Sequence, residues 1–200
     1  MVKGRAEKDT EGGRSLILQN VLDVLDLKHA QRVSELAQAL AKEAGLNERE
    51  TLLIGKGAMY HDIGKIAIPK SILEANRGLT DAERRTVEKH VEYGLSILAA
   101  YTGQEMSVAK TIIATHHEHW DGSGYPQGLK GELIPLCGRI VAICDVFDAL
   151  TSIRPYKKAW PIGEAIKYVA DRSGTQFDPV LTEKFIRNVA VHLGKVGVKV

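Results

Sequence analysis

Histidine and aspartate residues occupy positions in this sequence where helical spacing predicts burial. His29, for example, lies four residues before Val33 and seven before Leu36, on the apolar stripe of one predicted helix. Further residues continue or interrupt apolar runs in the same way: His61, Asp62, His90, His116, His117 and Asp145. A single buried histidine needs no special explanation, but buried carboxylates are costly unless they are paired or bind a metal. Together these positions predict a shared interior site.

The chemistry that such a group favours is metal-assisted hydrolysis. Imidazole and carboxylate ligands suit iron, manganese and zinc. The predicted set is larger than the four ligands of a closed structural zinc site. Two divalent ions that share a bridging carboxylate would use all of these ligands. Such a pair can activate a water molecule and bind the leaving oxygen of a phosphodiester.

The elements that must position these residues are all predicted to be helices. Asn47 to Glu50 and Thr80 to Glu83 resemble capping boxes, and Gly45 is a typical helix stop. Apolar stripes and these boundaries predict helices over residues 28–44, 47–61, 80–100, 107–117, 138–151 and 180–192. Residues 120–133 and 152–161 are expected to be ordered loops. The fold class predicted is an all-α, single-domain bundle of six or seven helices.

Composition limits the other classes of function. The 200 residues suit one domain, which we expect over residues 16–200 after a flexible N-terminal segment or linker remnant at 1–15. A net charge of +2 without a dense basic tract argues against binding to nucleic acid or a membrane surface. No run of 18 apolar residues predicts a membrane span, and the two cysteines, Cys137 and Cys144, are expected to be buried free thiols. We therefore expect a cytoplasmic, soluble protein.

Two motifs resemble those of a known family. His61-Asp62-Ile63-Gly64-Lys65 resembles the signature of the HD-domain phosphohydrolases. Residues 116–126, with the sequence HHEHWDGSGYP, resemble the HHExxDGxGYP signature of the HD-GYP branch. The likeness continues through residues 145–151, 154–157 and 174–179 and covers about residues 16–190. An HD pair alone would be weak evidence for the family, but the longer signature of residues 116–126 is specific.

The resemblance implies an all-α phosphodiesterase that cleaves cyclic di-GMP to the linear dinucleotide pGpG, and in many members on to GMP. One metal would lie among His29, His61, Asp62 and Asp145. Asp62 would bridge to a second metal held by His90, His116 and His117. The two ions would be divalent, with iron or manganese favoured, and a bridging water or hydroxide would be the nucleophile. Lys65 would act with Asp62 in catalysis by neutralising charge on the phosphate.

Further roles follow from the same resemblance. The nucleotide would be contacted by Asp23, Lys65, Asp148, Arg154 and Lys157. Leu25 stands where some members have a glutamate that binds a third metal, so the resemblance implies two metals here. The loop of Gly124-Tyr125-Pro126 would offer a contact for diguanylate cyclase domains.

Two alternatives stay open from the sequence. The domain could bind a cyclic dinucleotide or a cyclase without catalysis, as a signalling module. It could also keep the chemistry and act on another cyclic dinucleotide or on a mononucleotide. Loss of a metal ligand would favour the non-catalytic alternative, and the sequence lacks none of the predicted ligands.

Overall fold

The computed structural model of the chain describes residues 26–153 and 158–195. Within these ranges the chain is helical, and the only extended pairing is an isolated bridge between Ser173 and Phe177. The predicted all-α class is therefore confirmed. The predicted N-terminal segment, residues 1–15, lies outside the described residues.

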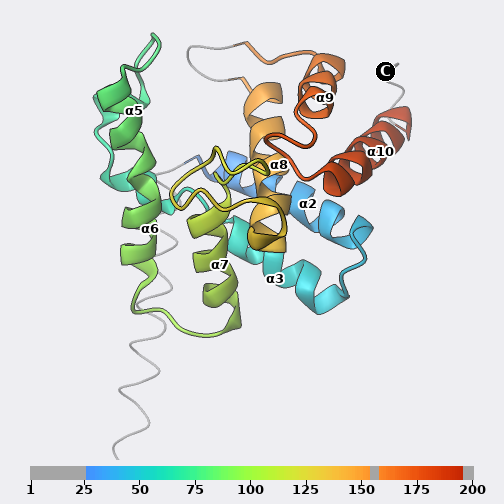
Figure 1. Cartoon of the computed structure of the whole chain (residues 1–200), viewed down its shortest axis with the longest axis horizontal. Coiled ribbons are helices and arrows are strands. Elements are labelled where there is room, and N and C mark those ends of the chain that lie inside the picture. Colours follow the sequence, from blue (N-terminus) through green and yellow to red (C-terminus); the bar gives the residue numbers. More distant parts are fainter. Residues whose placement is uncertain (1–25, 154–157, 196–200) are drawn as a thin grey trace, which may run out of the picture.

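Helices of different lengths follow one another along the chain (Figure 1). In order they are α2 (Leu27–Glu43), α3 (Glu48–Ala58), the 3₁₀ helix η1 (Ile63–Ala67), α4 (Lys70–Leu73), α5 (Asp81–Glu88), α6 (His90–Leu98), α7 (Gln104–Thr115), the 3₁₀ helix η2 (Gly131–Leu133), α8 (Leu136–Thr151), α9 (Ile162–Asp171) and α10 (Pro179–Lys195). Helix α8 packs against α2, α7, α9 and α10, so it lies at the centre of the bundle. Helices α5 and α6 continue one another along one side of the molecule.

The core consists of two clusters of buried apolar side chains that meet at α7. The larger cluster joins α2, α3, α7, α8, α9 and α10, and Val33, Ile112 and Ile143 are fully buried within it. The smaller cluster joins η1, α6 and α7 and contains Ile63 and Ile113. Ile112 and Ile113 thus face different clusters from neighbouring positions of one helix. The residues that follow α7 are held between the two clusters.

Several helix boundaries follow the local signals in the sequence. The capping boxes at Asn47 and Thr80 both form, with side chain and backbone bonded reciprocally to Glu50 and Glu83. Gly45 has a φ of +91°, a conformation that favours glycine after a helix end. These contacts confirm the predicted starts and stops of the early helices.

Two helical predictions differ from the structure. The predicted helix over residues 80–100 is divided at Lys89 into α5 and α6. Helix α9 was not predicted, although Ile162, Ala165, Ile166 and Val169 have helical spacing directly after the loop that ends at Pro161. The single bundle therefore contains more helical elements than the six or seven expected.

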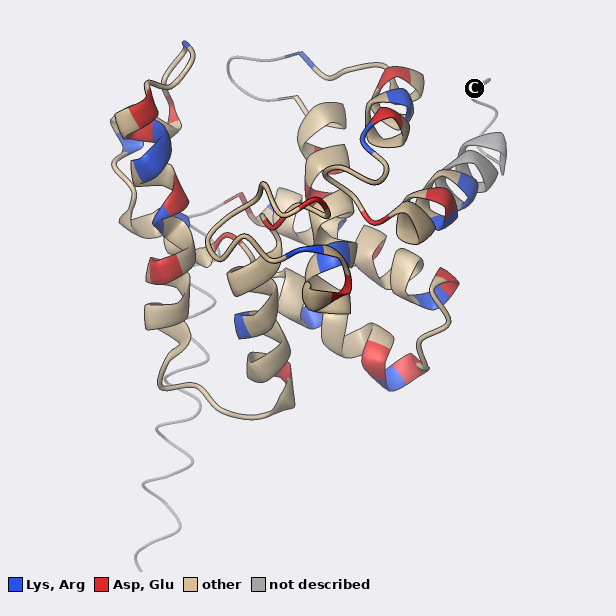
Figure 2. Cartoon of the chain, viewed as in Figure 1, with Lys and Arg blue, Asp and Glu red and all other residues tan. Residues whose placement is uncertain are grey.

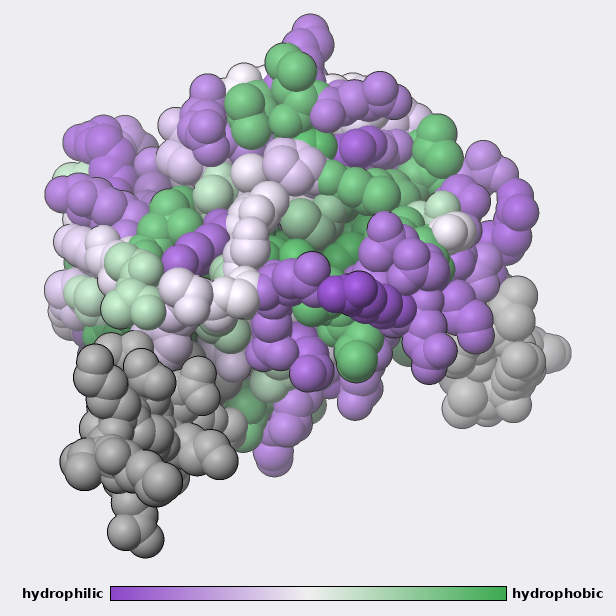
Figure 3. Space-filling view, turned by 90° about the horizontal axis from the view of Figure 1, so that it is seen from below, coloured by the Kyte–Doolittle hydropathy of each residue, from purple (hydrophilic) through white to green (hydrophobic). Residues whose placement is uncertain are grey.

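The surface mixes acidic and basic residues. Figure 2 shows both signs on α3, α5 and α10 without a large face of one charge, as the net charge of +2 suggests. On the face drawn in Figure 3, apolar residues gather near the middle and polar residues surround them. None of the helices in the described ranges combines the length and apolar character that a membrane span needs. Cys144 is buried and Cys137 is half-buried, and both are free thiols.

Candidate metal centre

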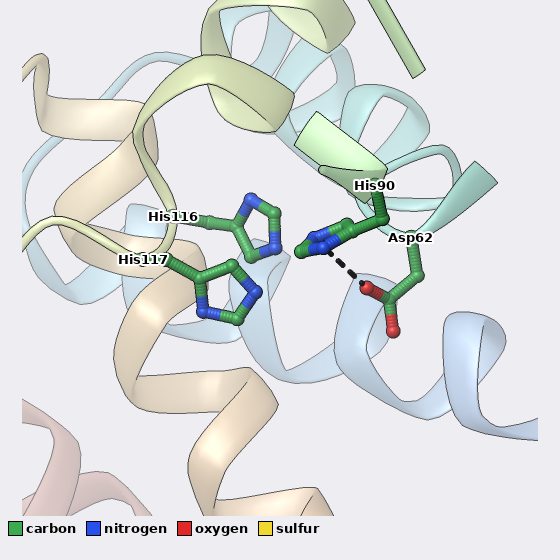
Figure 4. A group of neighbouring side chains, drawn as sticks. All are labelled: Asp62, His90, His116 and His117. Carbon is green, nitrogen blue, oxygen red and sulfur yellow. Dashed lines mark ion pairs between the residues drawn. The ribbon is translucent and has the colours of Figure 1, made fainter. Parts of the chain in front are cut away.

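The fold brings all seven predicted ligands to one interior region. They come from α2, the turn between α3 and η1, the start of α6, the end of α7 and the middle of α8. Their ligand atoms form two groups, each with its atoms within 4.8 Å of one another: His29, His61 and Asp145 in the first, and Asp62, His90, His116 and His117 in the second. Figure 4 shows the second group, in which three imidazole rings and one carboxylate face a common point. We call these the His29 group and the His90 group.

The Asp62 carboxylate lies between the two groups. Its Oδ2 is 3.4 Å from Nε2 of His61 and 3.9 Å from Nε2 of His29. Its Oδ1 is 3.6 Å from Nε2 of His90, the contact drawn as a dashed line in Figure 4. Each oxygen therefore faces a different group of histidines. This is the arrangement that a carboxylate needs to bridge two ions.

Hydrogen bonds orient the histidine rings toward the interior. Three rings donate Nδ1–H to main-chain carbonyls three or four residues earlier: His61 to Ala58 at 2.8 Å, His90 to Val87 at 2.7 Å and His116 to Ile112 at 3.0 Å. These bonds leave the Nε2 atom of each ring facing the centre. The same Nε2 atoms, together with Nε2 of His29 and Oδ1 of Asp62, are buried and have no hydrogen-bond partner in the described structure. Buried unpaired acceptors are costly, so this donor set fits divalent cations.

The electrostatics of the His90 group favour neutral imidazoles. Burial lowers the pKa of His116 to about 3, assisted by the nearby His61. Burial and His116 also lower the pKa of His117 well below its usual value. The pKa of His90 is lowered, chiefly by burial. Neutral imidazole is the form that binds metals, so these rings have their ligand lone pairs available at neutral pH.

The carboxylates of the site attract positive charge. Burial opposes the charged form of His61, but the neighbouring Asp62 and Asp145 carboxylates raise its pKa to about 10. Burial likewise opposes ionisation of Asp62, yet Lys65 and His61 hold its pKa well below the usual value. Both aspartates are therefore anionic at neutral pH. The same attraction that holds a proton on His61 favours a divalent cation among these residues.

A close approach of two backbones places Asp62 beside His90. A Cβ atom at Gly64 would lie 1.8 Å from the main-chain oxygen of His90 and 2.5 Å from the nitrogen of Gly94. Only glycine allows η1 and α6 to come this near. The glycine two residues after the HD pair is thus required by the geometry of the site, because it lets helix α6 deliver His90.

The segment that follows α7 is an ordered loop, as predicted. The buried Glu118 carboxylate accepts hydrogen bonds from the backbone N–H groups of Gln127 at 2.7 Å and Leu129 at 2.9 Å. The Tyr125 ring stacks on the His117 ring, with 4.7 Å between centroids and an interplanar angle of 21°. These contacts tie the glycine-rich signature to a metal ligand. The loop therefore supports the orientation of His117.

The same loop pairs with a distant segment of the signature region. The backbone N–H of Trp120 donates to Gln176 at 3.1 Å, and that of Asp121 donates to Thr175 at 2.8 Å. The Arg139 guanidinium lies 5.7 Å from the Trp120 ring centroid. It also forms an ion pair of 2.6 Å with Asp178. Residues 175 and 176 thus support the loop through their main-chain carbonyls.

Replacing Glu118 with glutamine tests the role of this carboxylate. Gln keeps the size but exchanges one acceptor oxygen for an amide donor, which would oppose a backbone N–H. We expect a loss of about 2 kcal/mol in the free energy of unfolding. Urea denaturation measures this loss, and faster proteolysis within residues 119–130 would accompany it. Unchanged stability would contradict the structural role of Glu118.

The predicted nucleotide-contacting residues have different outcomes. Lys65 forms an ion pair with Oδ2 of Asp62, and 27% of its side chain is exposed, so its amino group lies beside the site. Asp148 is only 3% exposed and contacts His29 and Arg32, and its contact with a nucleotide stays a prediction. Asp23, Arg154 and Lys157 lie outside the described residues, as does Leu25.

Sequence reasoning did not select Arg32 or Glu118. Arg32 lies three residues after His29, and Asp148 lies three residues after Asp145, so both pairs share a helix face. That repeated spacing was the signal in the sequence that Arg32 and Asp148 could contact each other next to the predicted ligands. Glu118 is part of the longer motif, but its burial could not be inferred from a loop sequence.

Comparison with known proteins agrees with this geometry. The family model described as HD domain matches residues 17–181. The chain is 40% identical over 186 residues to the cyclic di-GMP phosphodiesterase response regulator RpfG of Xanthomonas campestris, covering 93% of this chain and 46% of that protein. It is 45% identical over 160 residues to the 3'3'-cGAMP-specific phosphodiesterase 2 of Vibrio cholerae, covering 80% of this chain and 31% of that protein. The chain thus spans less than half the length of these relatives.

A solved structure shares the fold. Bd1817, an HDG"Y"P protein from Bdellovibrio bacteriovorus, superimposes with a TM-score of 0.65 at 22% sequence identity, covering 84% of this chain and 52% of that chain. The bundle architecture is therefore that of this structural neighbour. With the family match over most of its length, the chain belongs to the HD domain family, and its residues 116–126 keep their resemblance to the HD-GYP signature beside the candidate metal centre.

Proposed function

We propose that this domain is a metal-dependent phosphodiesterase that hydrolyses cyclic di-GMP to the linear dinucleotide pGpG. The observation that carries the proposal is the Asp62 carboxylate, whose two oxygens face two separate groups of buried, unpaired imidazole nitrogens. The names of relatives such as the cyclic di-GMP phosphodiesterase of Thermotoga maritima, 39% identical over 171 residues, support this substrate. That match covers 86% of this chain and 46% of that protein.

The residues divide the work of such a reaction. His29, His61 and Asp145 would hold one ion, His90, His116 and His117 the other, and Asp62 both. When bound, the two divalent ions would supply an activated water and bind the phosphodiester oxygens. Lys65 lies beside Asp62, where its ammonium group can neutralise charge that develops on the phosphate. The imidazole and carboxylate donors favour iron or manganese in our proposal.

The proposal is tested by incubating metal-reconstituted protein with cyclic di-GMP and separating the products. Reconstitution with iron or manganese under anaerobic conditions should yield the linear dinucleotide. A parallel assay that continues after pGpG has accumulated reports whether GMP is formed. Absence of turnover with every divalent metal tested would remove the enzymatic proposal. Tight nucleotide binding with full recovery of substrate would instead favour a non-catalytic signalling module.

A second candidate substrate is 3'3'-cGAMP. It is favoured by the 45% identity to a Vibrio cholerae phosphodiesterase named for that nucleotide. Both molecules present the same cyclic phosphodiester backbone to the metal centre and differ in one base. Comparing kcat/KM for the two nucleotides at one metal loading separates the candidates. A higher value for 3'3'-cGAMP would replace cyclic di-GMP as the proposed substrate.

Replacing Lys65 with alanine should lower kcat by about 100- to 1000-fold while both metals are retained. The expected loss follows from removing a cation that stabilises the charge developing on the phosphate in the transition state. Metal content by mass spectrometry and kcat with saturating nucleotide measure the two effects separately. Lys167, exposed on α9 and paired with Asp171, supplies the matched control, since its alanine variant should keep full activity. Loss of metal from the Lys65 variant would contradict the assigned role.

The loop of Gly124-Tyr125-Pro126 is proposed to contact diguanylate cyclase domains. Pro126 is exposed, while Tyr125 is half-buried against His117, so the tip of the loop is available to a partner. Calorimetry with a purified cyclase domain would detect the association. Equal heats for wild-type protein and for a Pro126→Ala variant would argue against contact through this loop.

We also propose a cytoplasmic location for the domain. Cys137 and Cys144 are both free thiols, and a reducing compartment keeps thiols in this state. Fractionation of cells that produce the protein, followed by detection with a specific antibody, would test this. Recovery outside the cytoplasm would overturn it.

A further inference from the structure

His29 is oriented by a different kind of partner from the other ligands. The Nδ1 atoms of His61, His90 and His116 bond to main-chain carbonyls. Nδ1 of His29 instead lies 2.6 Å from Oδ2 of Asp148, a buried carboxylate on α8. This contact joins residues 119 positions apart in the sequence. Among these four histidines, His29 is therefore the one whose Nδ1 is supported by a carboxylate.

The Asp148 carboxylate is itself held in place by α2. Arg32 Nε donates to Oδ1 at 2.5 Å, and Arg32 Nη2 donates to Oδ2 at 3.0 Å. The Ser152 hydroxyl adds a contact of 3.2 Å to Oδ2. Both oxygens of the carboxylate thus accept hydrogen bonds, and the two bonds from the Arg32 guanidinium fix the plane of the carboxylate. The guanidinium also balances the negative charge, which would be costly to bury alone.

Equal spacing of the contacting residues on α2 and α8 gives two successive pairs of contacts between these helices. His29 and Arg32 are one turn apart on α2, and Asp145 and Asp148 are one turn apart on α8. Because the two helices pack together, Nε2 of His29 lies 3.2 Å from Oδ1 of Asp145, another predicted ligand of the same group. One turn further along each helix, Arg32 and Asp148 form the second pair of contacts between α2 and α8. In the His90 group, the Nδ1 atoms of His90 and His116 contact main-chain carbonyls in place of a carboxylate.

We infer that Asp148, fixed by Arg32, is a positioning residue that sets the metal affinity of the His29 group while leaving that of the His90 group unchanged. A carboxylate that accepts Nδ1–H keeps Nε2 of His29 unprotonated and facing the site, and it makes that nitrogen a stronger ligand. A main-chain carbonyl fixes the tautomer with less effect on basicity. The inference rests on the proposed metal centre.

The experiment titrates metal-free protein with Mn²⁺ in a calorimeter and counts the ions retained after desalting by mass spectrometry. Wild-type protein should show two classes of site. Asp148→Asn preserves side-chain size but removes the charge and turns an amide donor toward Arg32 or His29. It should weaken one class by about 10- to 100-fold and leave the other within about twofold. After desalting, the variant should retain one ion where the wild type retains two.

Asp178→Asn is the matched control. Asp178 is also a buried aspartate in an arginine ion pair, 2.6 Å from Arg139, but it contacts no predicted ligand. Its variant should lose stability without any change in either Mn²⁺ affinity. Arg32→Ala should weaken the same class of Mn²⁺ site as Asp148→Asn. Arg32→Lys should recover part of the loss, because lysine restores the positive charge but not the two hydrogen bonds of the guanidinium.

Each outcome decides between the possibilities. Wild-type affinities in folded Asp148→Asn would overturn the inference, as would equal weakening of both classes in that variant. If Asp148→Asn does not fold, as circular dichroism would show, Arg32→Ala carries the test, and unchanged affinities there overturn it. Wild-type protein that binds no Mn²⁺, Fe²⁺ or Co²⁺ would instead disprove the metal centre itself, and the inference with it.

Discussion

Replacing Asp62 with alanine is expected to remove both metal ions and all phosphodiesterase activity together. Its two oxygens face His61 on one side and His90 on the other, so one substitution takes a ligand from each group. The change also leaves the buried imidazoles without the carboxylate charge that favours cations. Residues that act as one catalytic unit lose nearly everything when a single member is removed. Metal content and turnover of cyclic di-GMP, measured on one preparation, test this.

Two comparisons make the Asp62 result specific. Asp62→Asn keeps the volume and removes the charge, so it should also lose metal and activity while folding as the wild type does. Asp171→Asn, on the exposed surface of α9, should retain both ions and full activity. An Asp62→Ala protein that kept its metals and its turnover would show that the site has been placed wrongly.

Replacing Gly64 with alanine is expected to be the most disruptive change of a single methyl group among the described glycines near the site. The added Cβ would overlap the main-chain oxygen of His90 at 1.8 Å, and backbone atoms cannot turn aside as a flexible side chain can. Helix α6 must therefore move away from η1 and carry His90 with it. We expect a loss of about 3 kcal/mol in the free energy of unfolding. A weakened His90 group should follow, with one metal lost.

Gly163→Ala supplies the matched control for Gly64. A Cβ at Gly163 meets no atom within 4 Å, so alanine there should be neutral or slightly stabilising in α9. Urea unfolding and metal content are measured for both variants. If Gly64→Ala were as stable as Gly163→Ala and bound both ions, the close approach of η1 and α6 would not limit the site.

The helical class and most helix boundaries could be predicted from the sequence because they depend on neighbours a few residues apart. Apolar spacing of three and four residues defines α2, α7 and α8, and capping boxes define the starts of α3 and α5. The same local spacing placed His29, His116 and His117 toward the interior. Helix α9 was overlooked although its local pattern is complete, since Ile162, Ala165, Ile166 and Val169 follow helical spacing and pack in or against the larger core cluster.

The ligand set was predicted from burial patterns and two motifs, but its geometry required the packed structure. No local pattern could show that Asp62 turns one oxygen toward each group of histidines, because those histidines come from four separate helical segments. Nor could it show that the Asp148 carboxylate contacts both His29 and Arg32. Periodicity states which face of a helix is buried, whereas the packing of α2 against α8 decides what that face meets. Contacts between residues more than a hundred positions apart arise only when the helices assemble.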